Sequence, residues 1–168
     1  MESEWMGRYR GFISELVRHA NIEAKALNTR HNMSGVPMSA QEWQVLEYIV
    51  EHRDDDDRMI FISEKLQIPQ STFSKIIKYL AVNDLVEKYQ MKNNRKNIFL
   101  KPSEFGIQTY NKGSEALRKG GFMHLFASLD CLSDDVIETF TSALHDYNDS
   151  ISQEILPPEE DNELVKIK

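Results

Sequence analysis

Apolar residues recur at intervals of three and four along two stretches near the ends of the chain. The first stretch predicts a helix over residues 4–28, with apolar positions at Trp5, Tyr9, Phe12, Ile13, Leu16, Val17 and Ala20. The second predicts a helix capped by Ser133, with Asp134 and Asp135 in its first turn, where the helix dipole favours acids. Its apolar residues follow a heptad-like spacing: Ile137, Phe140, Leu144, Tyr147 and Ile151. A single helix cannot bury such a face, so we expect these residues, with Phe12 and Leu16, to join two copies of the chain.

Shorter elements are predicted in the middle of the chain. Ser39 and Glu42 form a capping-box pattern that opens a helix with apolar residues at Trp43, Leu46, Ile49 and Val50. A charged loop follows over residues 52–58. The apolar run 59–62 is expected to be a short strand, and Ser63 is expected to open a short helix after it.

A turn at Pro69 precedes a second helix, predicted from about Gln70 to Val82. Strands are expected over residues 85–90 and 98–100, joined by a polar turn over residues 91–97. The order of helix, short strand, short helix, tight turn, helix and hairpin is that of a winged helix-turn-helix. A further helix is expected from Pro102–Ser103 to about Leu129, kinked or broken at Gly120–Gly121.

The predicted fold is therefore mainly α with a small β wing, in which a winged helix-turn-helix domain is flanked by N- and C-terminal dimerisation helices. We expect an N-terminal dimerisation helix and loop over residues 1–38 and a winged helix-turn-helix domain over 39–119. C-terminal dimerisation helices are expected over 120–156. The acidic, proline-led tail over 157–168 is expected to be disordered.

The helix from Gln70 carries the main functional signal. Phe73, Ile76, Ile77 and Leu80 form one apolar stripe, and Ser71, Ser74, Lys75 and Lys78 lie on the opposite side. No acid occurs between Gln70 and Asn83, whereas a merely solvated surface helix usually mixes both signs of charge. Phosphates and guanine edges accept hydrogen bonds, so this face is typical of a helix that enters the major groove. The expected contacts are Gln70, Ser71, Thr72, Ser74, Lys75 and Lys78.

The predicted hairpin turn adds a second basic element. It reads Lys92-Asn93-Asn94-Arg95-Lys96, with three positive charges and no acid. A protruding basic hairpin fits a minor groove, where negative potential attracts arginine. Although a basic turn alone is more often simply solvated, its place after the Gln70 helix makes it a candidate DNA-binding wing.

Charge is unevenly distributed along the chain. The whole chain is acidic, with 20 Lys and Arg against 27 Asp and Glu, but residues 63–119 carry eleven basic residues and five acids. Binding to nucleic acid depends on the local field, so the acidic total does not exclude it.

Other chemistry finds little support in the sequence. The five histidines lack metal-ligand spacing, and the acidic run 54–57 lacks the glycine and distal glutamate of a calcium loop. Phosphate-binding glycine loops and nucleophile motifs are absent, so we expect neither a cofactor nor an enzyme. No apolar stretch is long enough to span a bilayer, there is no secretory signal, and Cys131 is the single cysteine. We therefore expect a cytoplasmic protein without a membrane partner.

Three stretches of the chain resemble the MarR family of bacterial regulators. They are Met38–Leu46, Ile62–Leu66 with Pro69–Lys75, and Leu85–Lys88, and the resemblance extends to about residue 156. The family wing usually carries Asp-x-Arg, and this chain has Asn93-Asn94-Arg95, so the arginine matches and the aspartate does not. The resemblance implies an obligate dimer made by the first and last helices, with each subunit contacting half of a palindromic site. We expect a repressor, with an activator as the alternative. The resemblance further implies a small aromatic or anionic effector, bound between the dimer helices and the DNA-binding lobe.

Two alternatives remain at this point. A winged helix can serve protein contact without DNA, although such a module would not require an acid-free helix face. The chain could also be a sensor or enzyme that merely retains the fold, which a cluster of catalytic side chains would support.

Overall fold

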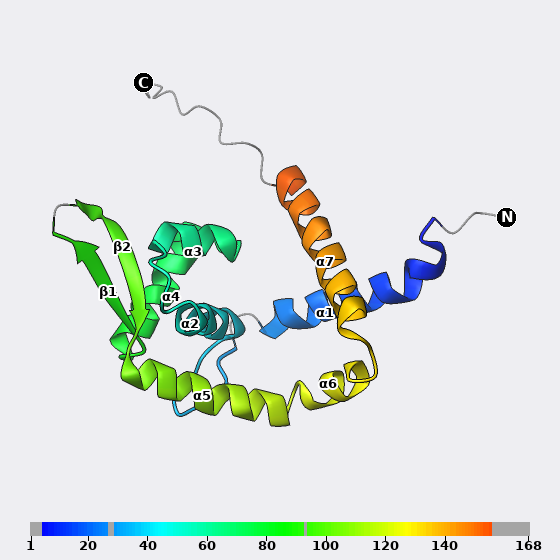
Figure 1. The fold of residues 1–168 in the computed structure, drawn as a ribbon, viewed down its shortest axis with the longest axis horizontal. Coiled ribbons are helices and arrows are strands. Elements are labelled where there is room, and N and C mark those ends of the chain that lie inside the picture. The colour runs from blue at the N-terminus through cyan, green and yellow to red at the C-terminus, as the bar shows by residue number, and fades with distance from the viewer. Residues whose placement is uncertain (1–4, 27–28, 93, 156–168) are drawn as a thin grey trace, which may run out of the picture. The chain divides into compact units, whose positions relative to one another are not determined.

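The computed structural model describes residues 5–26, 29–92 and 94–155 (Figure 1). Within these ranges the fold is mainly helical with one two-stranded antiparallel sheet, which confirms the predicted fold class. None of the described helices is both long and apolar enough to cross a membrane. The elements are η1 (Gly7–Tyr9), α1 (Arg10–Ala26), α2 (Ala40–Glu51), α3 (Met59–Lys65), α4 (Gln70–Val82), β1 (Val86–Met91), β2 (Asn94–Pro102), α5 (Glu104–Lys119), α6 (Met123–Leu129) and α7 (Asp134–Ile155).

The chain divides into two compact units, one up to Gly120 and one from Gly121 onwards. The core of the first unit lies where α2 packs against α4, α5 and β2. Its most deeply buried side chains are Phe73, Leu46, Ile77, Leu80, Leu85 and Val45. The predicted apolar stripe of α4 is thus confirmed as the face that packs on the domain.

The start of α2 has the predicted capping box. The Ser39 hydroxyl accepts a hydrogen bond from the backbone N–H of Glu42, and the Glu42 carboxylate accepts one from the backbone N–H of Ser39. Two N–H groups that the helix itself cannot pair are satisfied in this way.

The predicted strand over residues 59–62 is wrong, because these residues form the first turn of α3. Arg58, directly before α3, has an extended backbone and pairs with Phe99 of β2 as an isolated bridge. Ser63 does not open a helix either; it is buried inside α3, where its hydroxyl donates to the carbonyl of Ile60. A run of four apolar residues fits the period of a strand or of a helix, and packing against α4 and β2 selects the helix.

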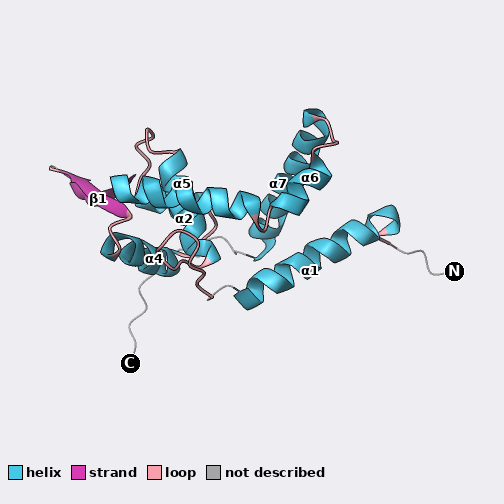
Figure 2. Ribbon diagram, turned by 90° about the horizontal axis from the view of Figure 1, so that it is seen from below, coloured by secondary structure: helices cyan, strands magenta, loops and turns pink. Residues whose placement is uncertain are grey.

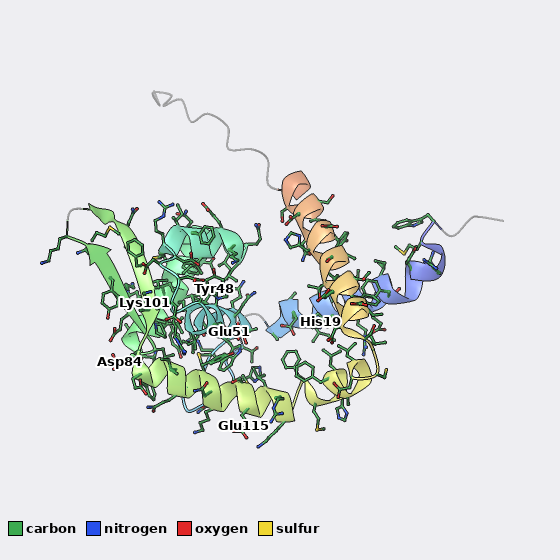
Figure 3. All side chains as sticks on the ribbon, in the orientation of Figure 1. His19, Tyr48, Glu51, Asp84, Lys101 and Glu115 are labelled. Carbon is green, nitrogen blue, oxygen red and sulfur yellow. The ribbon has the colours of Figure 1, made fainter. Side chains whose placement is uncertain are left out.

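The bounds of α4 are those predicted from the sequence. Gln67 has a φ of 53° in the turn before it, which reverses the chain between α3 and α4. Asp84, with a φ of 56°, follows the end of α4 and leads into β1 (Figure 3). Residues other than glycine rarely adopt a positive φ, so both positions mark sharp changes in the direction of the chain.

The hairpin is longer than predicted. Val86 pairs with Pro102 and Gln90 with Ile98, and an irregularity follows between Gln90 and Met91. Because β2 begins at Asn94 rather than Ile98, the polar turn predicted over residues 91–97 is too wide. The sheet projects beyond the helices at one end of the first unit, as a wing does (Figures 1 and 2).

Helix α5 approaches the rest of the first unit closely at two glycines. A Cβ atom on Gly106 would lie 2.0 Å from the carbonyl oxygen of Leu85, and one on Gly113 would lie 2.3 Å from the Trp43 ring. Trp43 in turn stacks on Tyr110, with ring centroids 5.7 Å apart. The predicted break at Gly120–Gly121 is present, since α5 ends at Lys119 and α6 begins at Met123.

The two terminal helices agree with the sequence pattern. The first begins with a turn of 3-10 helix and continues as α1, whereas residues 4, 27 and 28 of the predicted span lie outside the described residues. Helix α7 starts directly after Ser133, with Asp134 and Asp135 in its first turn as predicted. The tail predicted to be disordered, 157–168, also lies outside the described residues.

Candidate nucleic-acid interface

The outer face of α4 presents the polar side chains singled out from the sequence. Gln70, Ser71, Ser74, Lys75 and Lys78 are exposed, and Thr72 is half-buried. The opposite face is buried, so burial fixes which side of α4 meets solvent. In the part of the chain that the structure describes, neither Lys75 nor Lys78 has a carboxylate within salt-bridge distance. This face therefore offers hydroxyls, an amide and two ammonium groups to an acceptor-rich partner.

A cluster of three side chains fixes α4 to the preceding part of the domain. The Tyr79 hydroxyl donates a hydrogen bond to the carbonyl of Pro37, and the Arg30 guanidinium lies 4.0 Å from the centre of the Tyr79 ring. Arg30 also donates to both carboxylate oxygens of Glu42, at 2.9 and 2.6 Å. Because Tyr79 lies one turn beyond Lys75, this cluster determines how the outer face of α4 is held.

The pKa of Glu42 reflects its double role in the capping box and in the pair with Arg30. Burial acts to raise the pKa of this carboxyl, but the hydrogen bonds from Arg30 and Ser39 outweigh burial and leave it below its ordinary value. Glu42 is therefore ionised at neutral pH, and the same hydrogen bond raises the pKa of Arg30. Sequence reasoning found the cap and missed Arg30, which stands in a predicted loop twelve residues away.

A groove of about 330 Å³ opens beside the start of α4. It lies among α3, α4 and β2, and its lining residues are Arg58, Met59, Ile60, Ser63, Gln70, Phe73, Ser74, Asn97 and Ile98. Gln70 and Ser74 belong to the predicted interface, whereas Arg58 and Asn97 were not predicted. They come from stretches far apart in sequence, which the bridge between Arg58 and Phe99 brings together.

Only part of the predicted wing can be placed. The Lys92 side chain is exposed next to the end of β1, and Asn94, Arg95 and Lys96 form the start of β2. Asn93 lies outside the described residues, as do the side chains of the three residues that follow it. The wing contacts expected from Lys92 to Lys96 thus stay predictions.

The acidic run Asp54–Asp57 is anchored to the domain at two points. The Tyr48 hydroxyl donates to Asp57 at 2.7 Å, and burial followed by this hydrogen bond raises the pKa of Tyr48. Lys101 lies at the base of β2 (Figure 3). It donates to the carbonyls of Arg53 and Asp55 and to the Asp56 carboxylate, at 2.8 to 3.1 Å. No group of three metal-ligating side chains occurs among residues 5–26, 29–92 and 94–155. The run is held in place by protein contacts.

Apolar side chains expected at a dimer interface are exposed in the isolated chain. Phe12 is 45% exposed, and Phe140 and Tyr147 are each 49% exposed, while Leu16, Ile137, Leu144 and Ile151 are half-buried. Helix α6 lies within the predicted dimerisation segment 120–156 and has exposed apolar side chains that were not singled out in the sequence: Met123, Leu125, Phe126 and Leu129. Their three- and four-residue spacing is the signal in the sequence that points to them.

Comparison with known proteins bears on both the domain and the whole chain. Residues 38–106 match the family of winged helix DNA-binding domains. No curated protein matches the chain in sequence. The chain is 28% identical to a putative MarR family transcriptional regulator from Listeria monocytogenes, solved in complex with a 26mer DNA. That match covers 88% of this chain and 89% of the other, with a TM-score of 0.57.

Two more distant structures share the fold. S. aureus MepR in its DNA-binding conformation is 16% identical, with 84% of this chain and 98% of MepR covered and a TM-score of 0.64. The PcaV regulator from Streptomyces coelicolor, solved with its natural ligand, is 12% identical, with 90% and 99% covered and a TM-score of 0.60. Residues 38–106 are therefore similar to winged helix DNA-binding domains, and over most of its length the chain has the fold of MarR-family transcriptional regulators.

Proposed function

We propose that this chain is a transcriptional regulator that binds double-stranded DNA sequence-specifically as a homodimer. The observation that carries the proposal is the outer face of α4, which is polar, basic and free of acids within a winged helix domain. The proposed recognition contacts are Gln70, Ser71, Thr72, Ser74, Lys75 and Lys78. Residues 92–96 act as the wing, and two α4 helices related by a two-fold axis meet two halves of a pseudo-palindromic operator.

Similar proteins support DNA as the partner. The Listeria protein was solved with a 26mer DNA, and MepR from S. aureus and FabT from Streptococcus pneumoniae were also solved in complex with DNA. A winged helix that served only protein contact would have no need of an acid-free α4. We therefore favour DNA binding over a protein-interaction module, and regulation over catalysis.

The finer points of the proposal concern regulation. We propose a cytoplasmic repressor that a small aromatic or anionic effector modulates, with the DNA-binding domain over residues 39–119. PcaV, which shares the fold, was solved with its natural ligand, and this supports an effector. A dimer is supported by the apolar side chains left exposed on α1, α6 and α7, because a single chain leaves them in water.

The salt dependence of binding tests the proposal. A dimer that places two α4 helices and two wings on duplex DNA neutralises on the order of 6–10 phosphates, which gives a log–log slope of about −5 to −9. Fluorescence anisotropy with a labelled duplex at several salt concentrations measures this slope. Lys75→Gln should weaken binding, whereas Lys112→Gln, an exposed lysine on α5, should not. A flat salt response, or equal behaviour of the two variants, would favour the protein-contact alternative.

A further inference from the structure

The groove beside the start of α4 has the composition of an anion site. Five of the nine described residues that line it have polar side chains: Arg58, Ser63, Gln70, Ser74 and Asn97. Because the buried Ser63 hydroxyl already donates to the carbonyl of Ile60, the side chains that can donate to a bound anion are those of Arg58, Gln70, Ser74 and Asn97. Among the described residues that line it there is no carboxylate. Since Gln70 and Ser74 also belong to the exposed face of α4, a duplex lying on that face would cover the groove.

Arg58 supplies the positive charge of this groove, and the acidic residues next to it in sequence do not pair with it. The two acids that precede it are held elsewhere, Asp57 by Tyr48 and Asp56 by Lys101. Among the described residues the Arg58 guanidinium makes no hydrogen bond or ion pair, and the side chain is exposed. Its backbone is fixed by the bridge to Phe99, so the guanidinium starts from a rigid position between α3 and β2.

The start of α4 adds backbone donors on the same side. Pro69 stands at the N-cap and provides no side-chain acceptor, so the first N–H groups of this 13-residue helix keep their hydrogens free. These groups and the positive end of the helix dipole favour a negative charge near Gln70 and Ser71. Gln70, the first residue of α4, lines the groove, as Arg58 does.

We propose that this groove binds a backbone phosphate of the DNA duplex, with Arg58 as its charged ligand and Asn97 contacting it from the wing side. The inference rests on the proposed function and extends it to residues outside the recognition face. A phosphate contact fixes the register of the protein on the duplex and carries no sequence information. Arg58 therefore supplies affinity, and the outer face of α4 supplies specificity.

The test compares Arg58→Gln with Arg53→Gln, a matched change of an exposed arginine five residues earlier. Anisotropy titrations use a duplex selected by the unmodified protein and an unrelated duplex of equal length. Arg58→Gln should weaken binding to both duplexes by a similar factor, on the order of tenfold at low salt. Because a dimer loses two phosphate contacts, the log–log salt slope should fall by about 2. Arg53→Gln should match the unmodified protein.

Four results would overturn the inference. If both variants bind like the unmodified protein while Lys75→Gln weakens binding, the groove is not used although the proposed function stands. If Arg58→Gln weakens binding to the selected duplex alone, Arg58 contacts bases. If inorganic phosphate at constant ionic strength raises the Tm of the unmodified protein but not of Arg58→Gln, the groove binds a free anion instead of the DNA backbone. If the unmodified protein binds no duplex at low salt, the proposed function fails and this inference fails with it.

Discussion

Arg30 and Glu42 form a two-bonded ion pair in which the carboxylate is almost fully buried while the guanidinium stays half exposed. The guanidinium covers the Tyr79 ring of α4, and the carboxylate caps α2. One charged pair thus connects the segment after α1 with the helix proposed to contact DNA. The contribution of this pair to the free energy of unfolding can be measured directly.

Glu42→Gln should lower the free energy of unfolding by about 1–3 kcal/mol, because it removes charge-assisted hydrogen bonds and leaves Arg30 without its counter-ion. The matched control is Glu115→Gln, since Glu115 forms an exposed pair with Lys119 at 2.6 Å. That change should cost under about 0.5 kcal/mol. Urea unfolding followed by circular dichroism measures both values, and equal losses would show that the Glu42 pair contributes no more than a surface pair.

The same pair predicts a pH dependence. In the folded chain the pKa of Glu42 lies below its ordinary value of 4.5, so the folded state binds its proton less readily than the unfolded state. The stabilisation is therefore complete above about pH 4.5 and is lost as the pH falls through the folded-state pKa. The difference in unfolding free energy between the unmodified protein and Glu42→Gln should shrink over this range. A difference that stays constant down to low pH would contradict the assignment.

Gly106→Ala should destabilise the domain by about 1–3 kcal/mol or more, because the added methyl group meets the Leu85 backbone, which cannot move aside like a flexible side chain. Gly121→Ala is the matched control, as nothing lies within 4 Å of a Cβ there. Its effect should stay within about 0.5 kcal/mol. Thermal unfolding of both variants measures the contrast, and similar Tm values would mean that Gly106 of α5 does not approach the Leu85 backbone as closely as described.

Much of this architecture follows from local sequence signals. The bounds of α4 were predictable because an apolar stripe, a preceding proline and a polar stop coincide. The α3 helix was mistaken for a strand because four apolar residues fit both periods, and Ser63 looks like a cap when its burial is unknown. Nothing local indicates whether such a run packs as a helix or pairs as a strand.

The candidate site was predictable where it lies on one helix and not where it joins distant segments. Ser71, Ser74, Lys75 and Lys78 share a face by helical geometry alone. Arg58 lines the groove because an isolated backbone bridge holds it next to Phe99 of β2. Arg30 pairs with Glu42, which lies twelve residues later in the chain. In sequence, both arginines look like ordinary surface charges.

Leu144→Glu should yield monomers or insoluble protein, because it places a charge in the middle of the apolar face of α7 proposed to hold the dimer. Ser142→Glu, an exposed position on the other side of α7, should leave the dimer intact. Multi-angle light scattering of the purified proteins gives the mass of each. A monomeric mass for the unmodified chain would contradict the proposed dimer.

The central claim is that the outer face of α4 selects the bases of the operator, and selection of binding sites from a random duplex pool tests it most directly. The unmodified protein should enrich a pseudo-palindromic sequence. Variants at Ser71, Ser74 and Lys75 should shift the preferred half-site bases, whereas Arg95→Ala should leave those bases unchanged and weaken binding most on sites with A·T-rich flanks. Failure to enrich any sequence, or a change of half-site with Arg95→Ala but not with the α4 variants, would contradict the account.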